Sequence, residues 1–130
     1  MSGKKETKFW KLVKQRTPKI RWNRIENSVS QGFPDLIGSA ENSHFFSVEL
    51  KVANDKGIVS FSPHQIAWHR VNHGSKFILV QTLFPLSVKL FQSSFACRPR
   101  VKLTDHDPLF VVRDTHDPEQ WTTLQEHLIK

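Results

Sequence analysis

The feature that most constrains the fold of this chain is an apolar stretch at residues 45–52 that carries two charged residues at alternate positions. Its sequence, Phe-Phe-Ser-Val-Glu-Leu-Lys-Val, has the two-residue period of a β-strand, and we predict a strand over residues 44–52. Alternation sends Glu49 and Lys51 to one face and the apolar side chains around them to the other. A carboxylate and an ammonium therefore share one face of a strand whose other face builds the core.

Length and composition indicate one globular domain. The chain has 130 residues, of which 38% are hydrophobic and 24% are charged, values typical of a folded domain with a single core. No apolar run approaches the ~20 residues that a membrane span requires, and the Lys-rich N-terminus does not resemble a signal peptide. Cys97 is the only cysteine, which excludes an internal disulfide and a cysteine-cluster metal site and favours a reducing, intracellular setting.

The positive charge is concentrated at the N-terminus. Residues 1–24 carry a local balance of +8, whereas the remaining 106 residues balance to −1. A basic segment on a nearly neutral body is expected of a polyanion binder, and we favour DNA over a membrane because the segment lacks a broad apolar stripe. A solvated, solubilising tail is the alternative, but Trp10 and Trp22 are unusual in such a tail. The predicted DNA-binding residues are Lys4, Lys5, Lys8, Lys11, Lys14, Arg16, Lys19, Arg21 and Arg24.

Strand and helix patterns alternate along the first 92 residues and weaken after them. The clearest helix start is Ser62-Pro63-His64-Gln65, since Ser62 suits the N-cap, Pro63 the first turn and Gln65 a capping box. We predict a single domain with a core at about residues 5–92 and a C-terminal extension over residues 93–130. The expected elements are a helix at 5–16, strands at 20–27, 33–37 and 44–52, a turn at 40–43, a loop at 53–58, a helix at 63–72, strands at 76–82 and 86–92, short strands at 101–103 and 109–112, and a helix at 119–129.

Asp35 and Glu49 are candidates for a metal site. Hydrolysis of a phosphodiester bond uses a divalent cation to polarise the phosphoryl oxygen and to activate water, and Mg²⁺ needs only one or two carboxylates because it keeps several waters. If the strands that carry Asp35 and Glu49 form a hairpin, the two carboxylates meet, and the backbone carbonyl of Leu50 adds a third oxygen. Lys51 would orient the attacking water or neutralise phosphoryl charge. The alternative is that Glu49 and Lys51 are an ordinary exposed pair on an edge strand.

Three short motifs then follow one another along the chain. They are Gly32-x-Pro34-Asp35, Glu49-x-Lys51 and Ser62-Pro63-x-Gln65. Over roughly residues 5–82 this ordered string resembles the virus-type replication-repair nuclease domain, a branch of the PD-(D/E)XK nuclease superfamily. The resemblance implies an α/β domain with a central mixed sheet flanked by helices, and Mg²⁺ as the cofactor with Mn²⁺ as a substitute. It further implies Asp35 and Glu49 as metal ligands, Lys51 as the catalytic lysine and Gln65 near the metal site.

The same resemblance implies a glutamate on the first helix, where the match is loose. Glu6 is the only acidic residue in the helix predicted at 5–16 and is therefore our candidate. Glu26, on the following strand, is the rival, and a purely solvated charge is the other interpretation of Glu6.

Small members of this family, often viral, resemble resolvases that cut four-way (Holliday) DNA junctions as homodimers. The resemblance therefore implies a structure-specific DNA endonuclease that acts as a homodimer in the cytoplasm of a host cell such as an infected bacterium. Two alternatives stay open. One is a DNA-binding or replication accessory module that keeps a nuclease fold without catalysis, and the other is a nuclease for linear or single-stranded DNA.

Overall fold

The computed structural model describes residues 4–25, 32–41 and 44–130 of the chain. The elements, in chain order, are α1 (Lys4–Arg16), β1 (Arg21–Arg24), β2 (Leu36–Ser39), β3 (Phe46–Val52), β4 (Ile58–Ser60), α2 (Pro63–Val71), β5 (Lys76–Leu83), β6 (Leu86–Gln92), the 3₁₀ turn η1 (Ser93–Phe95), β7 (Arg100–Lys102), the 3₁₀ turn η2 (Leu103–Asp105), β8 (Phe110–Val112) and α3 (Pro118–Ile129).

Six strands form one mixed sheet in the order β1-β2-β3-β5-β6-β8. β3 and β5 are parallel, and every other neighbouring pair in this sheet is antiparallel. Parallel neighbours need a long crossover, and the one between β3 and β5 contains β4 and α2. β4 pairs with β7 in a second, two-stranded sheet. The chain is therefore the expected α/β domain with a central mixed sheet flanked by helices.

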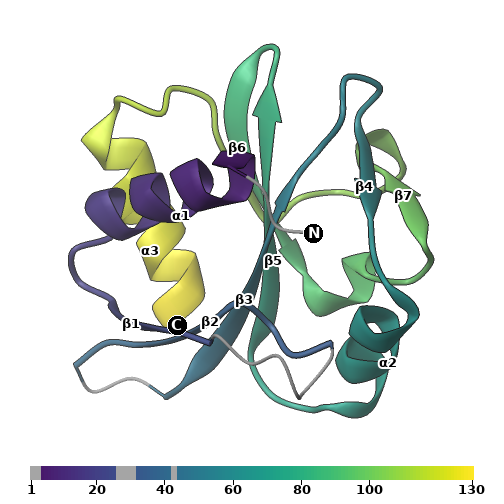
Figure 1. Ribbon diagram of the computed structural model, residues 1–130. Coiled ribbons are helices and arrows are strands. Elements are labelled where there is room, and N and C mark those ends of the chain that lie inside the picture. The colour runs from purple at the N-terminus through teal and green to yellow at the C-terminus, as the bar shows by residue number, and fades with distance from the viewer. Residues whose placement is uncertain (1–3, 26–31, 42–43) are drawn as a thin grey trace.

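Each face of the large sheet is covered by its own apolar layer. Figure 1 shows α1 and α3 on one side of the sheet and α2, β4 and β7 on the other. The buried side chains beneath α1 and α3 are Phe9, Val13, Ile20, Leu36, Phe46, Val48, Leu50, Leu79, Val88, Leu90, Val112, Trp121, Leu124 and Leu128. Those on the α2 side are Ala53, Val59, Phe61, Ile78, Val80, Phe91, Phe95, Ala96, Val101 and Leu103.

The alternation predicted for β3 is confirmed. Phe46, Val48 and Leu50 belong to the layer beneath α1 and α3. On the other face, Glu49 stands opposite Ile78 of β5 and Lys51 opposite Val80, and both β5 residues belong to the layer on the α2 side. The alternative that Glu49 and Lys51 lie on an edge strand is wrong, because β2 and β5 flank β3 on both sides.

The helix at 5–16, the helix at 63–72 and the strands at 76–82 and 86–92 are confirmed to within one residue. The strand expected at 33–37 is wrong in its bounds, because β2 runs from Leu36 to Ser39. Gly38, which directly follows the expected strand, lies inside β2. A Cβ at this position would come within 2.8 Å of the rings of Phe46 and Trp22, so glycine here makes room for two aromatic side chains.

Residues 93–130 contribute more than an extension. β8 is the sixth strand of the large sheet, and α3 buries Trp121, Leu124 and Leu128 in the same layer as Phe9 of α1. The boundary expected at residue 92 therefore does not separate a core from an appendage. β4 was missed because its three residues are too short to show a period, and β7, expected at 101–103, lies at Arg100–Lys102.

No helix among the described residues combines the length and the apolar character that crossing a membrane requires. Residues 26–27 of the expected strand at 20–27, and residues 42–43 of the expected turn, lie outside the described residues.

Candidate active site

Glu49 is the most deeply buried charged side chain of the candidate site. It lies in the middle of β3 and is only 2% exposed. Its Oε2 accepts a hydrogen bond of 2.9 Å from Nε2 of Gln65 and lies 3.9 Å from Nζ of Lys51. Its Oε1 is buried and, among the described residues, has no hydrogen-bond donor against it. Such an oxygen is costly to bury unless a cation or proton compensates it.

Asp35 lies beside Glu49 because β2 and β3 are antiparallel neighbours. The register pairs Leu36 with Val48, which brings Asp35, one residue before β2, opposite Glu49. The backbone N–H of Leu50 donates to Oδ2 of Asp35 at 2.8 Å and fixes that carboxylate against β3. The hairpin predicted from the sequence is therefore present. The role expected for the Leu50 carbonyl stays a prediction.

The two carboxylates affect each other strongly. Burial, followed by the negative charge of Asp35, raises the pKa of Glu49 well above its usual value, and Lys51 opposes this only in part. A side-chain hydrogen bond with Asp35 also favours the protonated form of Glu49. Two neighbouring carboxylates that repel each other are a natural place for a cation, because its positive charge relieves the repulsion.

Gln65 joins the helix α2 to the strand β3. Its side-chain Oε1 accepts from Nζ of Lys51 at 3.0 Å and from the backbone N–H of Ser62 at 2.9 Å, while its Nε2 donates to Glu49. The Ser62 hydroxyl accepts from the backbone N–H of Gln65 in return, which completes the capping box. Gln65 thus caps the start of α2 and also fixes the Glu49 carboxylate and the Lys51 ammonium.

Lys51 is held in place from three sides. Besides Gln65 and Glu49, its Nζ lies 5.0 Å from the centre of the Phe61 ring, a cation–π distance. Its side chain is 14% exposed, so one part still reaches solvent. No local pattern in the sequence points to Phe61, because its contact with Lys51 depends on how the chain after β4 lies over the sheet.

Gly32 of the first motif has a steric role in the site. Gly32 has a φ of +86°, and a Cβ there would lie 2.3 Å from the backbone oxygen of His64 in α2. Phe33 packs edge-on against Trp68 with ring centres 6.0 Å apart. The loop that delivers Asp35 therefore packs directly on the helix that delivers Gln65.

Glu6, near the N-terminal end of α1, interacts electrostatically with Asp35 and Lys51. Burial and then the charge of Asp35 raise its pKa, and Lys51 and Arg24 oppose the shift. These interactions place Glu6 within electrostatic range of the site, as expected for the glutamate of the first helix. Its rival Glu26 lies outside the described residues.

The residues present fit a divalent cation at Asp35 and Glu49. Both offer carboxylate oxygens, and the unpartnered Oε1 of Glu49 would gain a partner. Among the described residues no three His, Cys, Asp or Glu side chains are already arranged around a common metal position. Magnesium does not require three, because it keeps waters and takes substrate phosphate oxygens as ligands.

The described part of the basic segment, residues 4–24, contains the helix α1 and the strand β1. α1 buries Phe9 and Val13 completely, and Trp10 and Trp22 pack edge-on with ring centres 6.3 Å apart. The tryptophans are therefore part of the fold. Of the nine predicted DNA-binding residues, Arg16 is half-buried, nothing is described of the Lys4 side chain, and seven are exposed: Lys5, Lys8, Lys11, Lys14, Lys19, Arg21 and Arg24.

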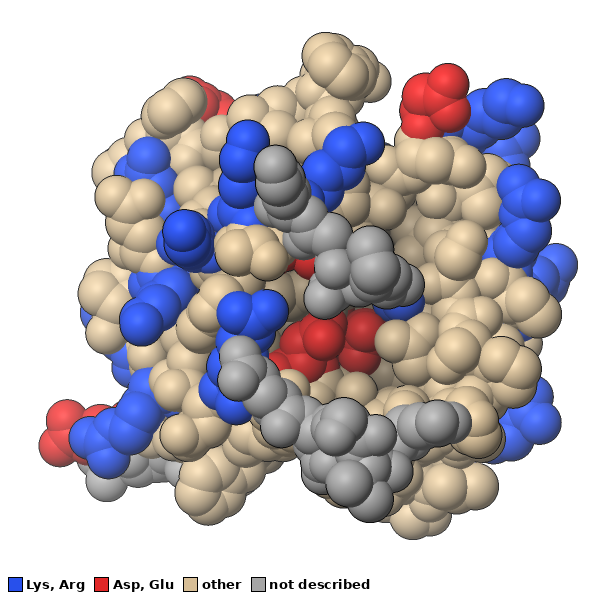
Figure 2. Space-filling model, viewed as in Figure 1, with Lys and Arg blue, Asp and Glu red and all other residues tan. Residues whose placement is uncertain are grey.

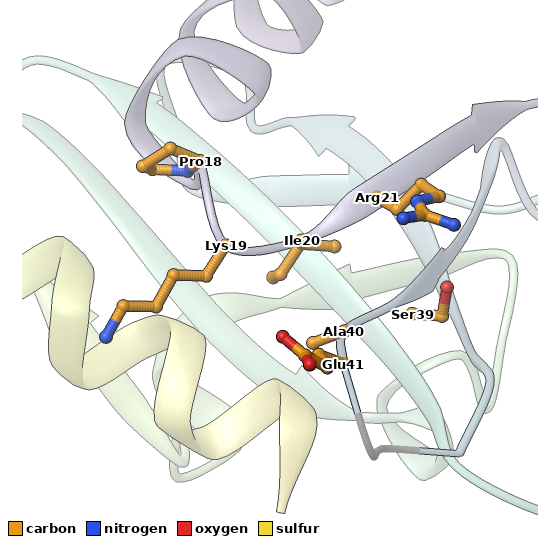
Figure 3. Close-up of a pocket in the computed structure, with 7 residues that line it drawn as sticks. All are labelled: Pro18, Lys19, Ile20, Arg21, Ser39, Ala40 and Glu41. Carbon is orange, nitrogen blue, oxygen red and sulfur yellow. The ribbon is translucent and has the colours of Figure 1, made fainter.

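One cavity lies away from Asp35, Glu49 and Lys51 and is lined in part by Lys19 and Arg21. It measures about 580 Å³ between the α1–β1 connection and the end of β2, opposite the end of β2 that follows Asp35. Figure 3 shows Lys19 and Arg21 extending from its wall in different directions, with Glu41 across from them. The two cations do not converge, and none of the candidate catalytic residues lines this cavity.

Comparison with known proteins adds nothing to this geometry: no protein-family model matches the chain, and no curated protein matches it.

Replacing Glu49 with Gln should stabilise the fold more as the pH rises. The folded pKa of Glu49 exceeds its unfolded value of about 4.5, so the stability it contributes is complete below the unfolded pKa and is lost as the pH rises through the folded pKa. In denaturant titrations without divalent cations, the free energy of unfolding of Glu49→Gln minus that of wild type should increase from about pH 5 to about pH 8.

Glu126→Gln, at an exposed position of α3, is the matched control for removing one negative charge. If Glu49→Gln and Glu126→Gln follow the same pH dependence, the two carboxylates of the site do not interact as described.

Proposed function

We propose that the chain is a metal-dependent, structure-specific DNA endonuclease of the virus-type replication-repair branch of the PD-(D/E)XK nucleases. The observation that carries the proposal is the convergence of three separate motifs on Glu49. Asp35 lies opposite it, Lys51 is 3.9 Å away, and Gln65 bonds both Glu49 and Lys51. A merely structural ion pair would not require a second carboxylate beside a buried one, since that arrangement costs stability.

Asp35 and Glu49 would hold Mg²⁺, with Mn²⁺ as a substitute. The chemistry supplied by the bound cation is polarisation of a phosphoryl oxygen and activation of a water. Glu6, close to Asp35, would position a ligand or a water from the side of α1.

Lys51 has the geometry of a charge stabiliser. Its ammonium is fixed by Gln65 at 3.0 Å and by the Phe61 ring, so little reorganisation is needed when negative charge develops on the phosphate. Gln65 keeps Lys51 from collapsing onto Glu49 by bonding each of them with a different atom of its amide. The arrangement leaves one carboxylate oxygen for a cation and one ammonium for the substrate.

The charge distribution supports DNA as the substrate. Figure 2 shows acidic side chains in a hollow in the middle of one face, with Lys and Arg side chains gathered over α1 beside it. Basic residues next to an acidic metal site hold a polyanion whose scissile phosphate reaches the carboxylates.

Four-way junctions are the substrate class we favour, cut by a homodimer. A junction presents two opposed strands in nearly symmetric positions, and a dimer with two-fold symmetry provides two matching sites. One copy of this chain has one such site. The alternative, a DNA-binding module without catalysis, is supported by the basic residues alone and needs neither Asp35 nor Lys51.

Cleavage of a four-way junction tests the proposal. Wild type should cut a labelled junction with Mg²⁺ or Mn²⁺, in preference to a linear duplex or a single strand, and Lys51→Ala should cut about 10²–10³-fold more slowly because it lacks a fixed stabilising charge. Lys102→Ala, which removes an exposed lysine of β7, should keep a rate close to that of wild type.

Wild type that binds the junction but releases no product with either metal would establish the DNA-binding alternative. Equal rates for Lys51→Ala and wild type would exclude the assigned role of Lys51.

The exposed lysines of α1 should make separable contacts with phosphates. A plot of log affinity against log salt concentration has a negative slope, because each phosphate contact releases a counterion. Replacing Lys8 and Lys11 together by Ala should make this slope less negative by about two. Fluorescence anisotropy with a labelled junction measures this slope.

The control is Lys102→Ala with Lys130→Ala, which removes the same charge from two exposed positions outside α1. Equal slopes for the α1 variant and the control would remove α1 from the DNA interface.

A further inference from the structure

The tip of the β5–β6 hairpin carries the most exposed aromatic side chain of the described residues. Phe84 is 94% exposed, and Leu86 beside it is 42% exposed. Thr82 braces the tip from within, because its hydroxyl donates to the backbone oxygen of Pro85 and bonds the hydroxyl of Ser87. Figure 1 shows the hairpin projecting past the other strands of the sheet. A braced tip that presents an aromatic ring to solvent is unfavourable in water unless something covers the ring.

A cavity of about 300 Å³ lies against this ring. Its walls come from three parts of the chain that are distant in sequence: α1, the loop after β3 and the hairpin tip. The lining residues used below are Lys5, Asn54, Asp55, Thr82, Leu83 and Phe84. This volume is at the lower end of the range for ligand sites, which suits one flat ring system and not a folded peptide.

The cavity adjoins the candidate active site. Lys5 directly precedes Glu6, and Ala53, another lining residue, follows Lys51 by two positions. The backbone N–H of Ala53 donates to the oxygen of Gln81 at 2.9 Å, which ties the end of β3 to the strand that leads into the hairpin. A DNA chain bound at Glu49 and Lys51 would therefore lie next to this cavity.

The polar groups of the cavity suit the parts of a nucleotide. Asn54 uses its Oδ1 to accept from the backbone N–H groups of Lys56 and Ile58, which leaves its amide NH₂ as a donor. The Asp55 carboxylate is an acceptor of the kind that binds the amino group of cytosine or adenine. Lys5 supplies a cation for a phosphate, and Phe84 supplies a ring face for a base.

We propose that this cavity receives one unpaired nucleobase of the DNA, stacked on Phe84. The inference rests on the proposed function and specifies its substrate: DNA with an unstacked base next to the scissile phosphate, as at a branch point. Stacking on an aromatic side chain accepts any base, so the site selects for DNA structure and not for sequence. An apolar side chain that enters a base step can also hold a branch open.

The test uses a four-way junction with an unpaired 2-aminopurine at its branch point, and a linear duplex with the same base paired. Both are titrated in Ca²⁺ with Mg²⁺ omitted. Wild type should quench the 2-aminopurine of the junction on binding, and Phe84→Ala should bind that junction about tenfold more weakly without quenching. Both proteins should bind the paired duplex equally. Phe84→Trp should restore binding and quenching, since it keeps a ring.

Phe45→Ala is the matched control, because Phe45 is 70% exposed at the other end of β3 and its loss should change neither measurement. Phe84→Ala that binds and quenches like wild type overturns the inference. The inference is also overturned if sedimentation shows that wild type is a dimer and Phe84→Ala a monomer, because the hairpin tip would then be a contact between two copies. Failure of the proposed function is distinguishable: quenching that needs Phe84, without any cleavage in Mg²⁺, leaves this site intact.

Discussion

The geometry of the candidate site depends on one interaction, the pairing of Gln65 with the buried carboxylate of Glu49. A carboxylate that is 2% exposed in the central strand of a sheet is unstable unless its charge is compensated. The amide of Gln65 supplies one hydrogen bond to it, donating to Oε2 at 2.9 Å, and accepts from Lys51 at 3.0 Å, which holds the ammonium nearby. Because the same amide also caps α2 through Ser62, the start of the helix and the geometry of the site are fixed together.

Close packing positions the motif Gly32-x-Pro34-Asp35 beside Glu49. The loop before β2 packs so closely on α2 that a Cβ at Gly32 would meet the backbone of His64. Asp35 then follows at the start of the strand next to Glu49 and is fixed by the N–H of Leu50. Three segments separated in the sequence thus form one arrangement with two repelling carboxylates at its centre. A fold selected for stability alone would avoid that pair. This cost is the reason for proposing a catalytic role for the arrangement.

Much of this was predictable from local patterns. The period of residues 45–52 gave the faces of Glu49 and Lys51, and the cap at Ser62 gave the start of α2. Long-range packing was not predictable. Nothing local shows that α3 buries Trp121 in the same layer as Phe9, that Phe61 lies against Lys51, or that a glycine inside β2 makes room for two rings. The basic segment was recognised by its charge, whereas its packing through Phe9 and Val13 depends on the sheet beneath it.

We propose that Asp35 and Glu49 hold a divalent cation together, and anomalous diffraction from crystals soaked in Mn²⁺ tests this directly. We expect a manganese peak within about 2–2.5 Å of oxygens of both carboxylates. The peak should be lost in crystals of Glu49→Gln, whose amide leaves the Asp35 carboxylate without its anionic partner. No peak at these residues in the wild type, or an equal peak in the variant, would contradict the account.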